Sequence, residues 1–291
     1  MTENKLTWQS KLVLLAVLPF AGVAVVLACN WWASQAAPVA IWTVGLSVLL
    51  GLVTWRLRAA TPAAALTGAL ITASLMFSTV VVPYLPWHTA LVPILAVSLI
   101  TFAATRAGHR KKEWLGTAEE RRGRSASQVA ANLGLAALVV SNPLQSWLAD
   151  SSWVPRHAAT PAMLFTLAVA ALAEAAADTT SSEIGQVLGG RPRMITSFKT
   201  VDPGRDGAIS LAGSLAGVVA AAAVAYAGMW ALGGGWIMFA VTCAGAVFGL
   251  FFDSLLGATL EERGLLNNDA VNFLSTASAA GFALALLCAM H

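Results

Sequence analysis

Long apolar segments separated by short polar connections fill most of this chain. We place nine of them, at about 11–29, 39–56, 62–83, 88–105, 127–148, 158–178, 208–229, 236–258 and 270–290. Most are close to or above the roughly 18 to 20 apolar residues with which an α-helix crosses a bilayer core. The strands of a membrane barrel would alternate over about ten residues, and no such alternation is present. The pattern predicts an all-α, polytopic transmembrane bundle of about nine spans.

Composition supports the same class of protein. Hydrophobic residues make up 58% of the 291 and charged residues 11%, whereas a soluble domain carries about 25% charge. We treat residues 1–291 as a single integral membrane domain with a basic loop at 106–126 and a second polar loop at 179–207. Only PYLPWH separates the third and fourth segments, so a re-entrant pair is an alternative to two full crossings there.

The distribution of basic residues predicts an orientation. With the N-terminus in the cytoplasm, 16 of the 17 lysines and arginines fall on cytoplasmic segments, and Arg156 alone falls outside. Such an excess is typical of cytoplasmic loops. We expect a multi-pass protein of a bacterial inner membrane with its site facing the cytoplasm. The sequence VLAC at 26–29 resembles a lipoprotein cleavage box, but the spans that follow argue against a cleaved leader.

Acidic residues inside the apolar segments are the first candidates for chemistry. Glu174 and Asp178 lie four residues apart and would share one helix face, with Glu183 following, and Asp253 lies in a later segment. A carboxylate inside a membrane is costly unless it is paired, solvated or bound to a metal. One interpretation is a buried salt bridge to Lys199 or an arginine. The one we favour is a Mg²⁺ site of Asp178, Glu183 and Asp253, because Mg²⁺ binds a few carboxylates together with phosphate oxygens.

A glycine-containing turn follows these acids in ITSFKTVDPGRDGAIS, residues 195–210. Gly204 and Gly207 would let backbone N–H groups approach an anion. Lys199 adds a positive charge, and Thr200 and Ser210 add hydroxyls. The order of a Walker A loop is absent. The turn therefore predicts a phosphate site, with a plain surface turn as the alternative.

Amides and the basic loop supply further candidates. Asn268 and Asn272, one turn apart in NNDAVN, are placed to bind a nucleotide, unless Asn268 or Asp269 only caps a helix. Asn132 is a polar side chain inside the fifth segment and needs a partner. The basic loop is explained by attraction to anionic lipid, or by Arg124 facing the site and receiving phosphate.

Four motifs in a fixed order make the chain resemble a known family. They are ADTTSSEIG at 177–185, RPRMITSFKTVDPGRDGAIS at 191–210, DSLLGA at 253–258 and NNDAVN at 267–272. In this the chain is similar to the integral membrane family catalogued as domain of unknown function 92, over roughly residues 60–290. Its plant members are phytyl-phosphate kinases of tocopherol synthesis. The family is distantly similar to dolichol kinase and to CTP-dependent cytidylyltransferases.

The resemblance implies transfer of a phosphoryl group from a nucleoside triphosphate, with CTP expected, to an isoprenoid monophosphate. It implies Asp178, Glu183, Lys199 and Asp253 as the catalytic residues, with Mg²⁺ as cofactor. With the positions chosen above, the expected substrate- and nucleotide-binding residues are Ser182, Arg193, Thr200, Gly204, Arg205, Gly207, Ser210, Ser254, Gly257, Asn268, Asn272, Asn132 and Arg124. We expect the protein to lie in the bilayer and to bind no nucleic acid. An oligomer is one option for its assembly.

This chain departs from the family pattern at two places, and other functions stay open. Thr180 stands where the family often has tryptophan, and RDGA at 205–208 stands where it often has TNGG. These changes bear on the substrate more than on the acids. The alternatives are a CTP-dependent lipid cytidylyltransferase, a transporter with Glu174, Asp178 and Asp253 as proton or cation sites, and a non-catalytic assembly factor.

Overall fold

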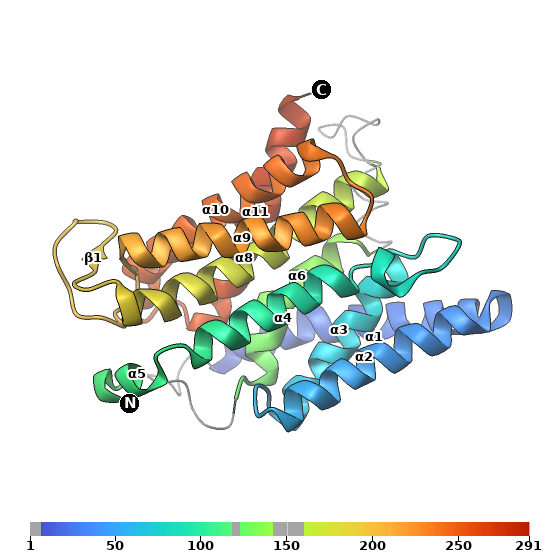
Figure 1. Cartoon of the computed structure of the whole chain (residues 1–291), viewed down its shortest axis with the longest axis horizontal. Helices are drawn as coiled ribbons and strands as arrows, with labels where there is room; N and C mark the ends of the chain where they lie inside the picture. The colour runs from blue at the N-terminus through green and yellow to red at the C-terminus, as the bar shows by residue number, and fades with distance from the viewer. Residues whose placement is uncertain (1–6, 118–122, 142–149, 151–159, 291) are drawn as a thin grey trace.

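A computed structural model describes residues 7–117, 123–141, 150 and 160–290. Helices run back and forth along one long axis (Figure 1). The elements are α1 (Thr7–Gln35), α2 (Ala37–Arg56), α3 (Pro62–Ser78), η2 (Pro86–His88), α4 (Leu91–Arg106), α5 (His109–Leu115), α6 (Ala126–Val139), α8 (Pro161–Leu188), β1 (Arg193–Met194), β2 (Ala208–Ile209), α9 (Leu211–Ala231), α10 (Trp236–Leu256), η3 (Gly257–Glu261) and α11 (Asn268–Ala289).

Every predicted apolar segment overlaps one of these helices, so the all-α membrane architecture is confirmed. Within the described ranges, six helices are long and apolar enough to cross a membrane, or seven if α4 and α5, bent by 60°, count as one span. The helices α3 and α6 have only 17 and 14 residues. Nine full crossings are therefore not confirmed, and the side of the membrane that holds the N-terminus stays a prediction.

Helix α8 lies at the centre of the bundle, with α4, α6, α9, α10 and α11 packed around it. From Met163 to Ala177 nearly every side chain is buried, and alanine predominates. Small side chains let several helices approach one axis at once. The acids of α8 are therefore carried on the most enclosed helix of the protein.

Glycines set the spacing of α9 and α10 around α8. A Cβ atom on Gly217 of α9 would come within 2.9 Å of the Ala177 carbonyl oxygen. A Cβ atom on Gly245 of α10 would come within 2.6 Å of the Ala279 carbonyl oxygen on α11. These close approaches explain the G-x-x-x-G spacing of the sequence as helix packing.

One end of the bundle, which we call the α5 end, collects the polar connections. It holds the α2–α3 link, α5, the start of α6, the β1–β2 hairpin, the end of α10 and the start of α11 (Figure 1). In the hairpin, Arg193 pairs antiparallel with Ile209, and Met194 with Ala208. The basic residues Lys5, Arg121, Arg122 and Arg156, used above for orientation, lie outside the described residues.

The start of α11 is fastened to α1 and corrects one prediction. The helix cap is Asn267, whose Oδ1 accepts a hydrogen bond from the Ala270 amide, so neither Asn268 nor Asp269 is the cap. Asp269 instead accepts a bond of 2.6 Å from the Ser10 hydroxyl. Gln9 donates to the Leu265 carbonyl. The first residues of the NNDAVN motif therefore help to connect α11 to α1.

Candidate functional site

Three carboxyl groups meet where α8 and α10 approach the α5 end. Asp178 and Asp253 lie within hydrogen-bonding contact of each other, and Glu174 lies close enough to interact with both. Glu174 and Asp178 are one helical turn apart, about 40° around α8, and both face α10. We call Glu174, Asp178 and Asp253 the carboxylate cluster. Topology alone predicted the meeting of Asp178 and Asp253, while Glu174 was outside the predicted site.

The walls of the cluster are closely fitted. Glu174 is 1% exposed, and its Cγ atom occupies the space where a side chain of Gly249 would lie, 2.6 Å from that Cβ position. Ser275 of α11 lies beside the carboxyls of both Glu174 and Asp253. Within the described structure, Oε1 of Glu174 and Oδ2 of Asp253 are buried without a hydrogen-bond partner. Buried polar atoms are rarely left this way, so the cluster has unused capacity to bind a cation or a proton.

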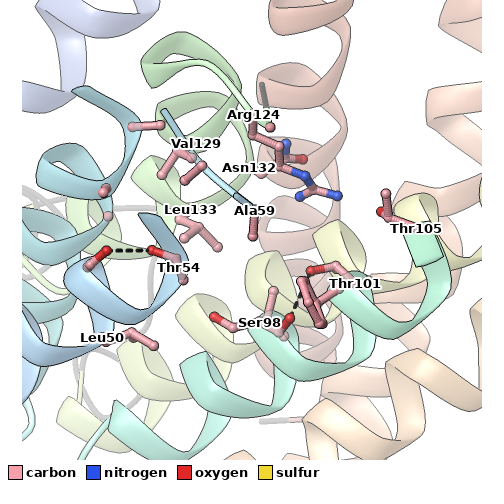
Figure 2. Close-up of a pocket in the computed structure, with 18 of the residues that line it drawn as sticks. Leu50, Thr54, Ala59, Ser98, Thr101, Thr105, Arg124, Val129, Asn132 and Leu133 are labelled. Carbon is pink, nitrogen blue, oxygen red and sulfur yellow. Dashed lines mark hydrogen bonds between the residues drawn. The ribbon is translucent and has the colours of Figure 1, made fainter. Parts of the chain in front are cut away.

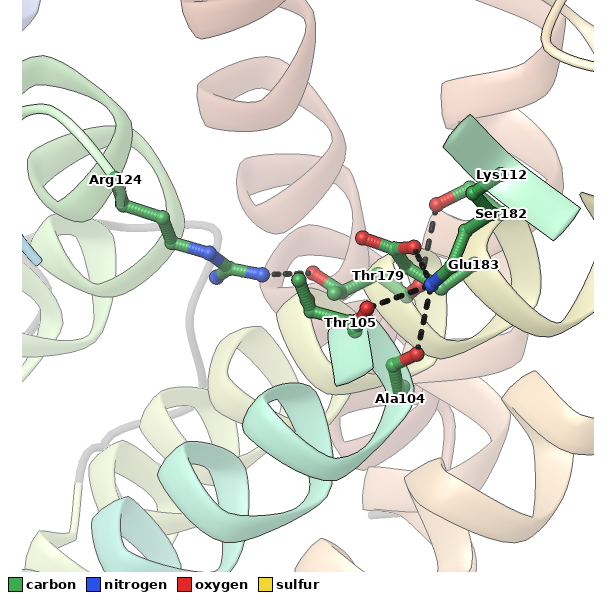
Figure 3. Close-up of polar contacts among 7 residues, drawn as sticks. All are labelled: Ala104, Thr105, Lys112, Arg124, Thr179, Ser182 and Glu183. Carbon is green, nitrogen blue, oxygen red and sulfur yellow. Dashed lines mark hydrogen bonds and ion pairs between the residues drawn. The ribbon is translucent and has the colours of Figure 1, made fainter. Parts of the chain in front are cut away.

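Glu183 does not join this cluster, which corrects the predicted metal set. Five residues after Asp178, it lies about 140° around the helix, and its Oε2 pairs with Nζ of Lys112 at 2.5 Å. Lys112 is 1% exposed and also donates to the carbonyls of Ala104 and Thr105 (Figure 3). This ion pair joins α5, α4 and α8. The salt-bridge interpretation of the acids is therefore correct for Glu183, but with a partner from the basic loop.

Without Glu183, the predicted Mg²⁺ site has two of its three ligands left, Asp178 and Asp253. No group of three or more His, Cys, Asp or Glu residues in the described ranges is arranged to hold a metal ion. Mg²⁺ commonly takes only one or two carboxylates, with substrate phosphates and water filling its octahedron. Asp178 and Asp253, with the unpartnered Oδ2 of Asp253, fit that mode of binding when a triphosphate is present.

Arg124 connects the carboxylate cluster to the other half of the bundle. Its Nη2 donates to the Thr179 hydroxyl at 3.3 Å, and its charge acts on Asp178 (Figure 3). Its backbone is fixed by two bonds to the α2–α3 link, from Thr61 to its carbonyl and from its amide to Ala59. Ser125 follows as the cap of α6 in a capping box. Arg124 is thus held by local structure in the position that the sequence suggested for it.

The glycine turn packs against the helix that carries Asp253. A Cβ atom on Gly207, whose φ is +74°, would lie 2.4 Å from the Ala258 amide and 2.6 Å from the Ser254 carbonyl. A Cβ atom on Gly257 would in turn lie 2.8 Å from the Gly207 amide nitrogen. Arg205 in the turn forms an ion pair with Glu262 just after η3. The turn therefore adjoins the carboxylate cluster, and Ser254 and Gly257 contribute their backbone to this contact.

Other predicted residues are placed less close to the cluster. Arg193, Lys199, Thr200 and Gly204 are exposed on the hairpin. Ser182 on α8 and Asn268 on α11 are also exposed. The Ser210 hydroxyl accepts from the Gly213 amide and caps α9, and Asn132 donates to the Gln128 carbonyl. Asn272 is buried, with an Oδ1 atom that has no partner in the described part of the chain. Of these side chains, Asn132 and Asn272 are buried.

An elongated cavity of about 360 Å³ lies beside the cluster, between α2, α3, α4 and α6 (Figure 2). Its wall includes Leu50 of α2, Gly68 of α3, Val97 of α4 and Leu133 of α6. At the α5 end it is lined by Arg58, Arg106, His109 and Arg124. Sequence reasoning did not find this cavity, because its residues come from several helices and the links between them and carry no shared motif.

The contact of Gly207 with α10 makes a specific prediction. Gly207→Ala adds backbone strain and a clash with Ala258 and Ser254, so we expect a loss of about 1–3 kcal/mol in the free energy of unfolding. Gly190→Ala is the matched control, because Gly190 has φ +63° and open space around its Cβ position. Thermal unfolding in detergent should show a clearly lower midpoint for Gly207→Ala than for the control, and equal midpoints would contradict this packing.

Asp206 in the same turn predicts a pH dependence. Asp206 is an exposed residue, but partial desolvation of its carboxyl, with the negative charge of Glu262, raises the pKa of Asp206 above its usual range. The native state then holds this proton more tightly than the unfolded chain, so stability falls as pH rises from about 3.9 through the raised native pKa. Asp206→Asn should be more stable than the parent at pH 7, and the difference should vanish near pH 3. Asp202→Asn, at the other aspartate of the same turn, is the matched control and should leave the stability at pH 7 nearly unchanged.

Comparison with known proteins places the chain among integral membrane proteins. The model of the family described as Integral membrane protein DUF92 matches residues 45–280. The chain is similar to the uncharacterized membrane protein MJ0933 of Methanocaldococcus jannaschii, 42% identical over 108 residues, which is 37% of this chain and 45% of that protein. It is also similar to the uncharacterized membrane protein sll0875 of Synechocystis, 32% identical over 212 residues, covering 69% of this chain and 75% of that protein.

A plant protein is also similar to this chain. The chloroplastic protein VTE6 of Arabidopsis thaliana is 32% identical over 187 residues, which is 62% of this chain and 54% of that protein. The chain thus spans about half the length of two of these three relatives. No solved structure matches it significantly. Since the family model covers most of the chain and all four motifs, this protein belongs to the DUF92 family of integral membrane proteins.

Proposed function

We propose that this protein is a membrane kinase that transfers a phosphoryl group from a nucleoside triphosphate to an isoprenoid monophosphate, with CTP as the expected donor. The observation that carries the proposal is the meeting of two unlike sets of charges. A buried carboxylate pair, Asp178 and Asp253, lies beside Arg124, at the end of an apolar cavity. The carboxylate pair would bind the cation of a triphosphate, and Arg124 would bind the phosphate of an anionic acceptor.

Family membership supports this proposal. The chain resembles plant phytyl-phosphate kinases in its four motifs, and VTE6 is among the proteins to which it is similar. Fold and family do not by themselves fix activity. The gathering of described basic residues at the α5 end supports the predicted orientation, with the site facing the cytoplasm of a bacterial inner membrane.

Phosphoryl transfer depends mainly on positioning and on neutralisation of charge. An oxygen of the acceptor phosphate attacks the γ-phosphorus, the bond to the β-bridging oxygen breaks, and the nucleoside diphosphate leaves. Arg124 would hold the acceptor phosphate in line. The acceptor needs no general base, because a phosphate monoester is already an anion. Lys199 and Arg193, exposed on the hairpin at the same end, would bind the triphosphate.

Mg²⁺, held by Asp178 and Asp253, would neutralise the charge of the β- and γ-phosphates and fix their orientation. The closed walls around these carboxyls, formed by Gly249 and Ser275, would hold both side chains in place and keep bulk water away. Glu174 lies next to both and would keep a proton or strengthen the local negative charge that attracts the cation.

An assay in detergent tests the proposal. Purified protein would be given Mg²⁺, γ-labelled CTP or ATP, and a panel of prenyl alcohols and monophosphates. Label in a prenyl diphosphate is the expected result. Label released as pyrophosphate, with a CDP-lipid as second product, would replace it with cytidyl transfer. If folded protein consumes no nucleotide with any lipid, the kinase proposal fails, and uptake into proteoliposomes would test the transporter instead.

A further inference from the structure

The cavity between α2, α3, α4 and α6 has the chemistry of an amphipathic site. Its charged residues lie at the α5 end, where Arg58, Arg106, His109 and Arg124 line the wall. No aspartate or glutamate in the described residues lines it. The opposite end is formed by residues such as Leu50 and Ile94. An occupant should therefore carry an anionic group at one end and an apolar chain along the rest.

The polar side chains along the wall do not alter this conclusion. The Thr54 hydroxyl donates to the Gly51 carbonyl at 2.9 Å, and the Thr72 hydroxyl donates to the Gly68 carbonyl at 2.7 Å. Asn132 donates to the Gln128 carbonyl of its own helix. Because these donors are already satisfied within their helices, they require nothing from a ligand. Away from the α5 end, the wall therefore offers mainly apolar surface, with Leu50, Ile94, Val97 and Leu133 among its residues.

The dimensions fit one chain of moderate length. Ile94 and Arg106, at opposite ends of the cavity, are 12 residues apart on α4, which is about 18 Å along the helix. One leaflet of the hydrocarbon core measures about 15 Å. Small residues of α3, Ala64, Ala65 and Gly68, line the wall and leave width for a branched chain.

The arrangement of helices provides a route from the bilayer. Helices α2 and α3 pack closely on each other but only lightly against α4, and the cavity lies between them. A lipid chain could then enter sideways from the membrane while its head remains near the α5 end. Arg124 lines this cavity and also reaches Thr179, beside Asp178. The anionic head would therefore lie next to the carboxylate cluster.

We infer that this cavity binds the acceptor lipid of the proposed kinase, a prenyl monophosphate about as long as phytyl phosphate. The chain lies between α2, α3, α4 and α6, and the phosphate is held by Arg124 and Arg58. This inference rests on the proposed function for the identity of the lipid. It adds the location of the acceptor and a structural limit on the length of its chain.

A binding measurement without nucleotide tests the site apart from catalysis. Labelled phytyl monophosphate would be titrated into protein in nanodiscs of zwitterionic lipid. Ser98→Trp fills the cavity and should weaken binding about tenfold or more. Leu99→Trp is the matched control, because Leu99 is the next residue of α4, is 67% exposed, and does not line the cavity. It should bind as the parent does.

Two further variants keep the test decisive. If Ser98→Trp does not fold, Gly68→Leu fills the same space, since a Cβ atom there meets only Val129, at 3.7 Å. Arg124→Gln should weaken binding of the phosphate about 10- to 100-fold and leave binding of phytol nearly unchanged. Affinity should rise from geranyl to phytyl monophosphate and gain little more with undecaprenyl monophosphate.

The outcomes separate the site from the activity. Unchanged binding in both cavity-filling variants, or equal displacement by phosphatidic acid, would overturn the site. If the cavity-filling variants still bind the lipid and keep normal turnover, the kinase proposal stands, but its acceptor lipid does not bind in this cavity. If the lipid binds as expected but no nucleotide is ever consumed, the cavity stands as a lipid site and the kinase proposal fails.

Discussion

Asp253→Asn should reduce kinase turnover by about a thousandfold or more while leaving the fold intact. Asp253 and Asp178, which lie next to each other, are the carboxylates that we propose hold the cation of a bound triphosphate. A bound cation contributes several kcal/mol of transition-state stabilisation, and about 1.4 kcal/mol corresponds to a factor of ten in rate. The neutral amide keeps the shape of the side chain but removes its charge. The loss should therefore appear in kcat, with little change in KM for the lipid.

A matched control and a second readout make this result interpretable. Thr242→Val changes a fully buried polar residue of the same helix, 11 residues or about 16 Å away, and should keep normal turnover. Binding of Mn²⁺ in the presence of a non-hydrolysable triphosphate should weaken in Asp253→Asn but not in Thr242→Val. A folded Asp253→Asn protein with full turnover would remove Asp253 from any metal site.

Much of the fold could be predicted because the membrane limits the choices. Each apolar segment had to become a helix, since exposed backbone groups are not tolerated in lipid. The alternation of the helices then placed the ends of α8 and α10 on the same side. Asp178 and Asp253 could for this reason be paired from the sequence alone. The length of α3 was less predictable, because the apolar residues Val80, Val81 and Val82 follow its end. The segment predicted at 127–148 continues beyond α6 into residues that the structure does not describe.

The remainder of the site depended on tertiary contacts that leave little trace in sequence. Lys112 looked like one of several surface charges in the basic loop, yet it is almost fully buried. Glu183 looked like a third metal ligand, although its five-residue spacing from Asp178 already placed it on another face of the helix. The cavity is lined by residues of several helices, and its small residues on α3 could not be told apart from the many other alanines and glycines of the sequence.

Lys112→Met should lower the free energy of unfolding by about 3–5 kcal/mol, because it leaves the carboxylate of Glu183 buried without its partner. The side chain of Lys112 is 1% exposed, and its ammonium group also satisfies the carbonyls of Ala104 and Thr105. Lys111→Met is the matched control, since Lys111 is the exposed neighbour and donates only to the Val187 carbonyl. Denaturant titration in mixed micelles would measure both variants.

The ion pair between Lys112 and Glu183 also leads to a prediction about the role of Glu183 in the ADTTSSEIG motif. If Glu183 serves mainly to anchor α5 and the end of α4 to α8, Glu183→Gln should lose stability, and its folded fraction should keep its kcat. Lys112→Met and Glu183→Gln should then be strongly non-additive in the double variant, because each removes the same contact. A Glu183→Gln protein of normal stability but without turnover would instead return Glu183 to the catalytic set. Glu183 would then take part in catalysis, and its main role would not be to connect α4, α5 and α8.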